Sequence, residues 1–293
     1  MKKDLRVLMI GAHPDDCDSC YGGLAVKYIR AGAVVKFMSL CNGNGGHHVM
    51  APDEIAERRY GEVQNIAKLA GLVEYQVWRD IPDCKLEANL ENRERLVRDI
   101  RLFNPDIIIS CRPNDYHADH RNTGILVQDA SYLLIVPNYC PDAPAMRQMP
   151  VICYGFDRFQ NPVFQPDVVI ATDDSVDAKF EMMDCHVSQF YEWLPYTDGI
   201  LEEVPEGAAE RLDWLHSPKI DRSVKPQDKE VLAARPANPY SEYNEAYQAA
   251  LYRKQLVKRY GKAGKNVHFA EGYCVCEYGK QMTKEMENEL FPL

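Results

Sequence analysis

Two short segments of the 293-residue chain combine histidine with aspartate directly after apolar runs. The segment AHPDD (12–16) ends the apolar run 5–12, and the segment NDYHADH (114–120) follows the apolar run 106–111. Continuous apolar runs of this length are typical of buried parallel strands. Ligands of open α/β sheets bind at the carboxyl ends of the strands, where the strand order reverses. We therefore expect the two segments to face each other across one crevice.

The residue types in these segments suit a catalytic zinc ion. Such an ion takes three protein ligands of N or O type and leaves one position for water. His13, Asp16 and His120 can supply that set. Asp15 is then left beside the metal, where its carboxylate can take the proton from the zinc-bound water.

The second segment offers two further groups for the hydrolysis of an amide. His117, when protonated, can hydrogen-bond the oxyanion of a tetrahedral intermediate and later protonate the leaving amine. Asp119 can accept a hydrogen bond from a histidine ligand and so fix the orientation of its ring. We count Asp15, His117 and Asp119 as the catalytic candidates.

Each segment alone has a simpler interpretation. A histidine after a strand is often a capping residue, and an Asp-Asp pair often caps the following helix. Two such clusters at one edge of one sheet favour a metal site instead. The identity of the metal stays open, because two histidines and one aspartate can also hold Fe(II), Co or Mn.

The rest of the chain predicts the elements that position these residues. Strand patterns at 5–12, 33–40, 74–78, 106–111, 150–154 and 167–172 alternate with helical patterns at 22–31, 52–70, 89–103, 119–135 and 173–190. This alternation predicts an α/β fold, a Rossmann-like three-layer sandwich with a mostly parallel sheet. We expect residues 1–190 to form the metal-dependent core and residues 191–293 an extension that wraps it within the same domain. The tract 195–245 has little periodicity and is interpreted as a long loop or insertion.

Composition narrows the class of protein. The chain has 46% hydrophobic residues and a formal net charge of −10, which suits a globular protein and argues against binding to nucleic acid. No apolar run is long enough to span a membrane. The start MKKDLRVLMIG is interpreted as a first strand and not as a leader. Ten cysteines without a disulfide framework indicate a reducing compartment, so we expect a cytoplasmic protein.

The two segments also resemble those of a known family. AHPDD after the first strand and HADH (117–120) after the fourth are similar to motifs of the LmbE/PIG-L family of zinc-dependent de-N-acetylases. Weaker matches are RYGE (59–62), Lys179 with HVSQ (186–189), and AEGY (270–273). The resemblance spans about residues 5–190, with one short piece near the C-terminus. The tract 195–245 has no counterpart in it.

The resemblance implies the same ligands, base and oxyanion-stabilising residue as above. It adds Arg59 as a residue that contacts sugar hydroxyls and Asp80 as an acid that contacts the substrate. A solvated helix charge is the alternative for Arg59. For His186 a structural role beneath the site is favoured.

The function that follows is removal of an N-acetyl group from an N-acetylated amino sugar or glycoconjugate by metal-activated water. The implied partner is a small N-acetylated molecule, and both a monomer and a homo-oligomer are compatible with the sequence. One alternative is a metal-dependent amidase that acts on a non-sugar conjugate. Another is a Rossmann-like nucleotide-binding module that uses the NGNGG loop (42–46), although no GxGxxG follows the first strand. Aromatic residues near 191–214 can shape a carbohydrate pocket, cover the core or form an oligomer contact.

Overall fold

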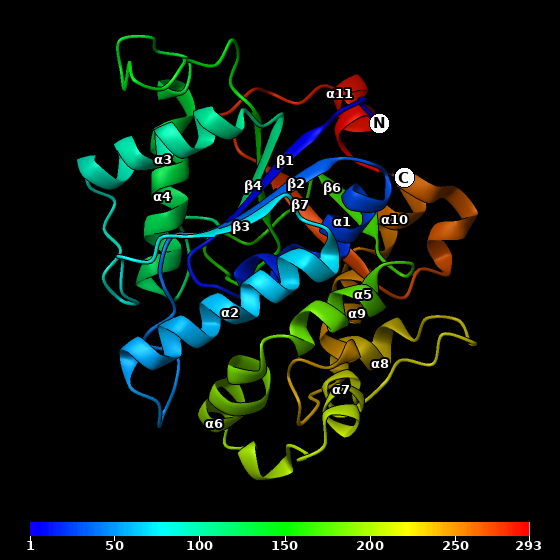
Figure 1. The fold of residues 1–293 in the computed structure, drawn as a ribbon. Helices are drawn as coiled ribbons and strands as arrows, with labels where there is room; N and C mark the ends of the chain where they lie inside the picture. The colour runs from blue at the N-terminus through cyan, green and yellow to red at the C-terminus, as the bar shows by residue number, and fades with distance from the viewer. Residues whose placement is uncertain (293) are drawn as a thin grey trace.

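Seven strands form one sheet within residues 1–292, the part of the chain that the computed structural model describes (Figure 1). In space their order is β3-β2-β1-β4-β5-β7-β6. The strands are β1 (Arg6–Gly11), β2 (Val34–Ser39), β3 (Glu74–Val77), β4 (Ile107–Ser110), β5 (Val151–Gly155), β6 (Val168–Ala171) and β7 (Ala270–Val275). Strands β1 to β5 pair in parallel, and β7 runs antiparallel between β5 and β6. The prediction of a mostly parallel sheet is confirmed, and β1 lies beside β4.

Alternate residues of the central strands supply two cores, one on each face of the sheet. Leu8 and Ile10 of β1 point to the face covered by α3 (Leu90–Phe103), α4 (Ala118–Leu133) and α10 (Arg253–Tyr260). Val7 and Met9 point to the face covered by α1 (Asp16–Arg30), α2 (Pro52–Ala70), α5 (Val176–Asp184) and α11 (Lys284–Leu290). Burial of both faces explains why these strands are apolar throughout.

Helix α1 begins six residues earlier than the sequence pattern predicts. The backbone N–H groups of Asp15 and Asp16 donate to the carbonyl of His13 at 2.9 and 3.3 Å, which closes a tight turn at the end of β1. Acidic residues Asp16 and Asp18 then occupy the first helical turn, where the helix dipole favours negative charge. One candidate metal ligand therefore lies on the first turn of a helix.

The predicted helix over 173–190 is shorter in the structure. Helix α5 ends at Asp184, and a π-helical turn η1 (Gln189–Trp193) leads into α6 (Leu194–Asp198). Between them, His186 and Ser188 turn inward to polar partners on other elements. These buried polar contacts interrupt the helix.

The tract 195–245 is not a structureless loop. It carries α7 (Ala208–His216) and α8 (Asp228–Ala233), with the short 3-10 turn η2 (Leu201–Glu203) before them. Leu215 and Val231 pack with Phe180 and Phe269 into a third apolar cluster beside α5 and α9 (Glu242–Leu251). Residues 191–293 also supply β7 to the sheet and the 3-10 turn η3 (Gly261–Lys265). No helix in residues 1–292 combines the length and apolar character needed to cross a bilayer.

Candidate active site

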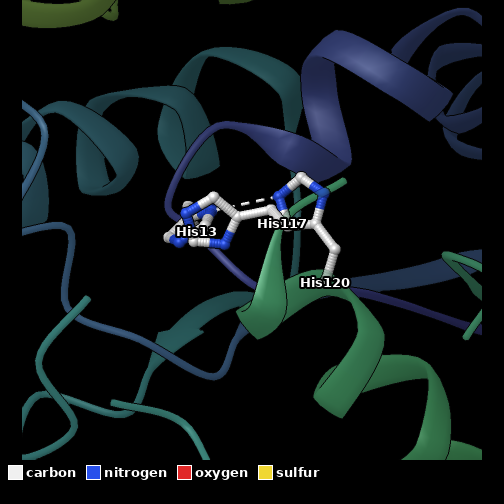
Figure 2. Close-up of side chains that lie close together, drawn as sticks. All are labelled: His13, His117 and His120. Atoms are coloured by element: carbon white, nitrogen blue, oxygen red, sulfur yellow. Dashed lines mark hydrogen bonds between the residues drawn. The ribbon is translucent and has the colours of Figure 1, made fainter. Parts of the chain in front are cut away.

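The two histidine-aspartate segments meet at the carboxyl ends of β1 and β4, which are adjacent strands. His13 and Asp16 come from the turn after β1 and the start of α1. His117 caps α4, and His120 lies on its first turn. Figure 2 shows the imidazoles of His13, His117 and His120 converging from these two elements. The crevice predicted from the sequence is therefore present in the fold.

Three candidate ligand side chains face one another within this crevice. His13 Nδ1 lies 3.1 Å from His120 Nε2. Asp16 Oδ2 lies 3.9 Å from His13 Nδ1, and Asp16 Oδ1 lies 3.5 Å from His120 Nε2. Ligands about 2.0–2.1 Å from a tetrahedral zinc lie roughly 3.3–3.4 Å from each other, so the separation of the two nitrogens and that of Asp16 Oδ1 from His120 Nε2 are close to such an ion, whereas the separation of Asp16 Oδ2 from His13 Nδ1 is longer.

Backbone geometry fixes the carboxylate of Asp16. Its Oδ2 accepts hydrogen bonds from the N–H groups of Ala12 at 2.7 Å and His13 at 2.8 Å, which leaves Oδ1 directed toward His120. A Cβ at Gly11 would lie 2.5 Å from the Cβ of Asp16. Glycine at the end of β1 therefore permits this close approach.

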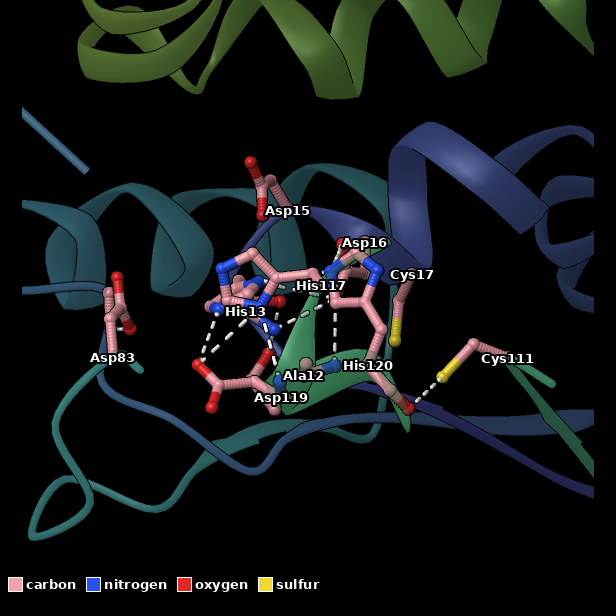
Figure 3. Close-up of polar contacts among 12 residues, drawn as sticks. Ala12, His13, Asp15, Asp16, Cys17, Asp83, Cys111, His117, Asp119 and His120 are labelled. Carbon is pink, nitrogen blue, oxygen red and sulfur yellow. Dashed lines mark hydrogen bonds and ion pairs between the residues drawn. The ribbon is translucent and has the colours of Figure 1, made fainter. Parts of the chain in front are cut away.

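A carboxylate holds the outer nitrogen of each facing histidine. His13 Nε2 lies 3.1 Å from Asp119 Oδ2 (Figure 3). His120 Nδ1 lies 3.2 Å from Asp115 Oδ1. Asp119 is fully buried and also accepts from the backbone N–H of Cys84 at 2.6 Å. Sequence reasoning missed Asp115, although its place two residues before His117 in the DYHADH run was an available signal.

The carboxylates control the protonation of the histidines. Burial lowers the pKa of His120, but Asp16 and Asp115 outweigh burial and raise it to about 9. Burial likewise opposes the rise in the pKa of His13 that Asp119 and Asp16 cause. Burial raises the pKa of Asp16, but the two histidines outweigh burial and lower it.

His117 has a different environment from the two facing histidines. Its Nδ1 accepts the backbone N–H of Asp119 at 3.1 Å as the N-cap of α4, so a neutral ring carries its proton on Nε2. Burial and the neighbouring His13 and His120 lower its pKa. Ligand atoms of His13, His117 and His120 all lie within 4.8 Å of one another, so a three-histidine ligand group is the alternative to the set with Asp16.

Arg59 lies beneath the glycine-rich loop and reaches Asp15. Its Nη2 is 3.0 Å from Asp15 Oδ1, and its Nη1 donates to the carbonyl of Gly43 at 3.2 Å. Only 2% of the Arg59 residue surface is exposed, so the solvated helix charge considered as an alternative is not what the structure shows. A Cβ at Gly46 would lie 2.8 Å from Arg59 Nη1, so the loop lies directly against the guanidinium.

A cavity of about 280 Å³ opens between these residues. Asp15, Arg59 and His117 line it, and Trp193 and Leu194 bring the C-terminal extension to its wall. Among the aromatic residues of that extension, Tyr191 and Trp214 instead pack in the third apolar cluster.

Asp80 does not lie in this cavity. Its exposed carboxylate binds Arg95 at 2.8 Å on the outer surface. The cavity instead holds Asp83, which sequence reasoning missed. Asp83 accepts the backbone N–H groups of Gly43 at 2.8 Å and Gly45 at 3.0 Å, so it anchors the glycine-rich loop.

The other residues of the family-like motifs join elements beneath the site. His186 is fully buried, and its Nε2 lies 2.7 Å from Asp18 Oδ1. Ser188 Oγ donates to Glu62 at 2.6 Å. Lys179 Nζ donates to Glu271 of β7 at 3.2 Å, which ties the extension to the core. His47 of the glycine-rich loop is likewise paired, with Glu192 at 2.8 Å.

Comparison with known proteins agrees with this geometry. Residues 8–131 match the family model described as PIG-L: GlcNAc-PI de-N-acetylase. Residues 8–131 are thus similar to a PIG-L domain. The match contains both histidine-aspartate segments. The family match and the deacetylase relatives support a hydrolase that acts on an amide C–N bond, and PIG-L deacetylases are in general metal-dependent.

Curated relatives extend the similarity beyond the PIG-L domain. A probable N-acetyl-alpha-D-glucosaminyl L-malate deacetylase 2 of Bacillus anthracis is 23% identical over 73% of this chain and 93% of its own length. A 1D-myo-inositol 2-acetamido-2-deoxy-alpha-D-glucopyranoside deacetylase of Thermobispora bispora is 29% identical over 40% of this chain and 48% of its own length. The chain thus spans about half the length of the second relative.

Solved structures share the fold of nearly the whole chain. The N,N'-diacetylchitobiose deacetylase of Pyrococcus horikoshii superposes with a TM-score of 0.66 at 20% identity, covering 93% of this chain and 84% of that one. GalB of Pseudomonas putida, a 4-carboxy-2-hydroxymuconate hydratase, gives 0.65 at 18% identity, covering 97% and 99%. Because a deacetylase and a hydratase share this fold, the activity has to be argued from the site.

Proposed function

We propose that the protein is a zinc-dependent deacetylase that releases acetate from an N-acetylglucosaminyl-type sugar. The observation that carries the proposal is the convergence of His13, Asp16 and His120 with Asp15 and His117 at one small cavity. A metal-ligand set, an unligated carboxylate and an N–H donor are the parts that hydrolysis of an amide requires. The names of both curated relatives support an N-acetylated sugar as substrate.

The facing histidines fit a bound cation. Carboxylates only accept hydrogen bonds, so His13 Nε2 and His120 Nδ1 must donate to Asp119 and Asp115. In neutral rings the remaining nitrogens then direct lone pairs at each other across 3.1 Å. A cation or a proton between them relieves this repulsion.

We choose Asp16 as the third ligand over His117. Asp16 directs Oδ1 at the facing nitrogens, and it supplies a negative charge to the cation. His117 uses Nδ1 as a helix cap, and His117 Nε2, which has a long contact of 4.0 Å with Cys84 Sγ, can act on the substrate. Zinc is the proposed ion because two imidazoles and one carboxylate are a ligand set of catalytic zinc, and elemental analysis distinguishes it from the Fe(II), Co or Mn that the same set can hold.

When bound, the metal ion lowers the pKa of a water molecule and polarises the substrate carbonyl. Asp15 takes the proton from the attacking water as its oxygen adds to the carbonyl carbon. His117, neutral because of its lowered pKa, donates its Nε2–H to the developing oxyanion. Asp15 then delivers the proton to the leaving nitrogen as the C–N bond breaks. This differs from the expectation that a protonated His117 supplies that proton.

Arg59 and Asp119 have positioning roles in this proposal. Arg59 fixes the carboxylate of Asp15, and Asp119 fixes the ring of His13. The cavity of about 280 Å³ lies just below the usual range of small-molecule sites, which suits a single sugar ring. All ten cysteines are free, which supports a cytoplasmic location.

The decisive experiment is a screen of N-acetylated amino sugars with detection of the free amine. We expect amine release, its loss after treatment with a chelator, and its recovery with zinc, together with about one zinc per chain by elemental analysis. An unsaturated hydroxy acid serves as the control for hydratase activity. Hydration of that acid without amine release from any sugar would refute the deacetylase.

A further inference from the structure

A second cavity, of about 220 Å³, adjoins the candidate active site. Its wall includes Asp16, Tyr116 and His120, which also line the active-site cavity. Figure 3 shows Cys111, which lines the second cavity, and Asp83, which lines the first, on opposite sides of the histidine cluster. We propose that this second cavity receives the acyl group and that the enzyme removes acyl chains longer than acetyl. This inference rests on the proposed deacetylase function.

The direction of the scissile amide places the acyl chain on this side. A carbonyl carbon has three substituents in one plane, namely oxygen, nitrogen and the acyl carbon. Asp15 and His117, which serve the nitrogen and the oxygen, line the first cavity but not the second. The acyl carbon is therefore directed away from them, past Asp16 and His120 into the second cavity.

The wall of the second cavity suits a hydrocarbon. Gly11, Cys20, Tyr21, Gly155 and Phe156 contribute apolar or weakly polar surface.

The charged side chains of this wall are already paired. Arg112 Nε donates to Asp157 at 2.6 Å, and Asp115 is held by His120. An uncharged chain can therefore enter without removing a charge from its partner.

The size of the cavity exceeds what acetyl requires. A water molecule occupies about 30 Å³ of liquid, and the methyl group of acetate is of similar size. A volume of about 220 Å³ leaves room for several further methylenes. Cys20 lies at the exposed side of this cavity on α1, so a longer chain can extend toward solvent.

The first test compares N-acetyl, N-butyryl and N-hexanoyl glucosamine with the zinc-loaded enzyme. Burial of each methylene raises kcat/KM by up to about fourfold, so we expect hexanoyl to be cleaved at least as efficiently as acetyl. Cleavage of acetyl with a loss of tenfold or more at butyryl would overturn the acyl cavity and leave the deacetylase standing. Cleavage of none of these substrates would count against both.

The second test fills the cavity through Cys20→Phe, with Cys20→Ser as the volume-matched control. The measured quantity is the ratio of kcat/KM for hexanoyl to kcat/KM for acetyl. We expect Cys20→Phe to lower this ratio at least tenfold and Cys20→Ser to keep the ratio of the unaltered enzyme. An unchanged ratio in Cys20→Phe would overturn the assignment. Inhibition by hexanoate relative to acetate tests the same cavity in the unaltered enzyme, and equal inhibition by the two would also contradict it.

Discussion

The guanidinium of Arg59 lies 3.0 Å from the carboxylate of Asp15, although Arg59 lies on α2 and Asp15 is the N-cap of α1. Arg59 reaches Asp15 from α2, under a loop whose glycines leave room for it. The arginine thus contacts the proposed base and not only the cavity.

Replacement of Arg59 by alanine should reduce kcat, because Asp15 loses the charged group that orients it. We expect loss of this ion pair to reduce kcat roughly 10- to 100-fold, which corresponds to about 1.4–2.7 kcal/mol of transition-state stabilisation. Arg59→Lys should restore part of the rate. Steady-state kinetics and metal content of both variants check this. A rise in KM with kcat intact would instead assign Arg59 to the sugar hydroxyls.

Two adjacent aspartates should respond differently to the same substitution. Asp15→Asn should keep its metal and lose roughly 10²–10⁴ in kcat, because only the base is removed. Asp16→Asn should lose metal, and excess zinc should partly restore activity. Zinc content and kcat of the two variants are the measurements. Metal loss in Asp15→Asn with retention in Asp16→Asn would reverse the assignment.

His117 combines a helix cap with the proposed oxyanion contact, and two substitutions separate these roles. Asparagine is a good N-cap, so His117→Asn should unfold at nearly the temperature of the unaltered protein. Both His117→Asn and His117→Ala should keep zinc and KM and lose roughly 10²–10³ in kcat. Full activity in His117→Asn would show that the imidazole serves only as a cap.

Removal of the metal should make stability depend on the protonation of His120. Its folded-state pKa of about 9 exceeds the ordinary value of about 6.5. The stabilising contribution is complete below about pH 6.5 and is lost as the pH rises through about 9. We expect the Tm of chelator-treated protein to fall over this range.

The matched control for this pH dependence is chelator-treated His120→Ala, in which the fall should be smaller. Zinc-loaded protein should resist the fall, because metal affinity increases as the histidine proton leaves. An equally steep fall in His120→Ala would exclude His120 as its source.

The buried ion pair between Lys179 and Glu271 should be important for stability. Lys179→Met leaves two buried carboxylates, Glu245 and Glu271, without their partner, at a cost of about 3–5 kcal/mol. Lys219→Met, which breaks an exposed pair with Asp213, should leave the free energy of unfolding nearly unchanged. Urea unfolding of both variants checks the difference. Equal stability of the two variants would refute this role.

The sequence predicted the parts of this molecule that depend on local patterns. Continuous apolar runs predicted the strands, and the position of each histidine-aspartate segment directly after a run predicted the meeting at β1 and β4. Helix α1 started earlier than predicted because its first turn contains aspartates and cysteines and no amphipathic period. The helices of 195–245 were missed because each has few turns over which a period can repeat.

Local sequence patterns could not predict which side chains contact each other across the fold. Asp80 and Asp83 lie three residues apart in a segment without periodicity, and only the tertiary fold directs one to Arg95 and the other to the glycine loop. The burial of Arg59 similarly depends on Gly43 and Gly46, which are distant from it in sequence. Local sequence patterns therefore predicted that the two histidine-aspartate segments meet, but they could not predict these side-chain partners.

Strand β7 is synthesised after all the other strands of the sheet. A ribosome releases the N-terminus first, so His13 and His120 emerge long before the strand that completes the sheet. Until β7 emerges, β5 lacks its neighbour on one side, and β6 lacks the strand with which it pairs. Tyr154 of β5 likewise lacks its cross-strand partner Cys274. Such distant pairings slow folding and leave exposed edges open to association. The nascent chain therefore needs residues 270–275 before β5 and β6 are paired, although the proposed metal ligands lie within residues 13–120.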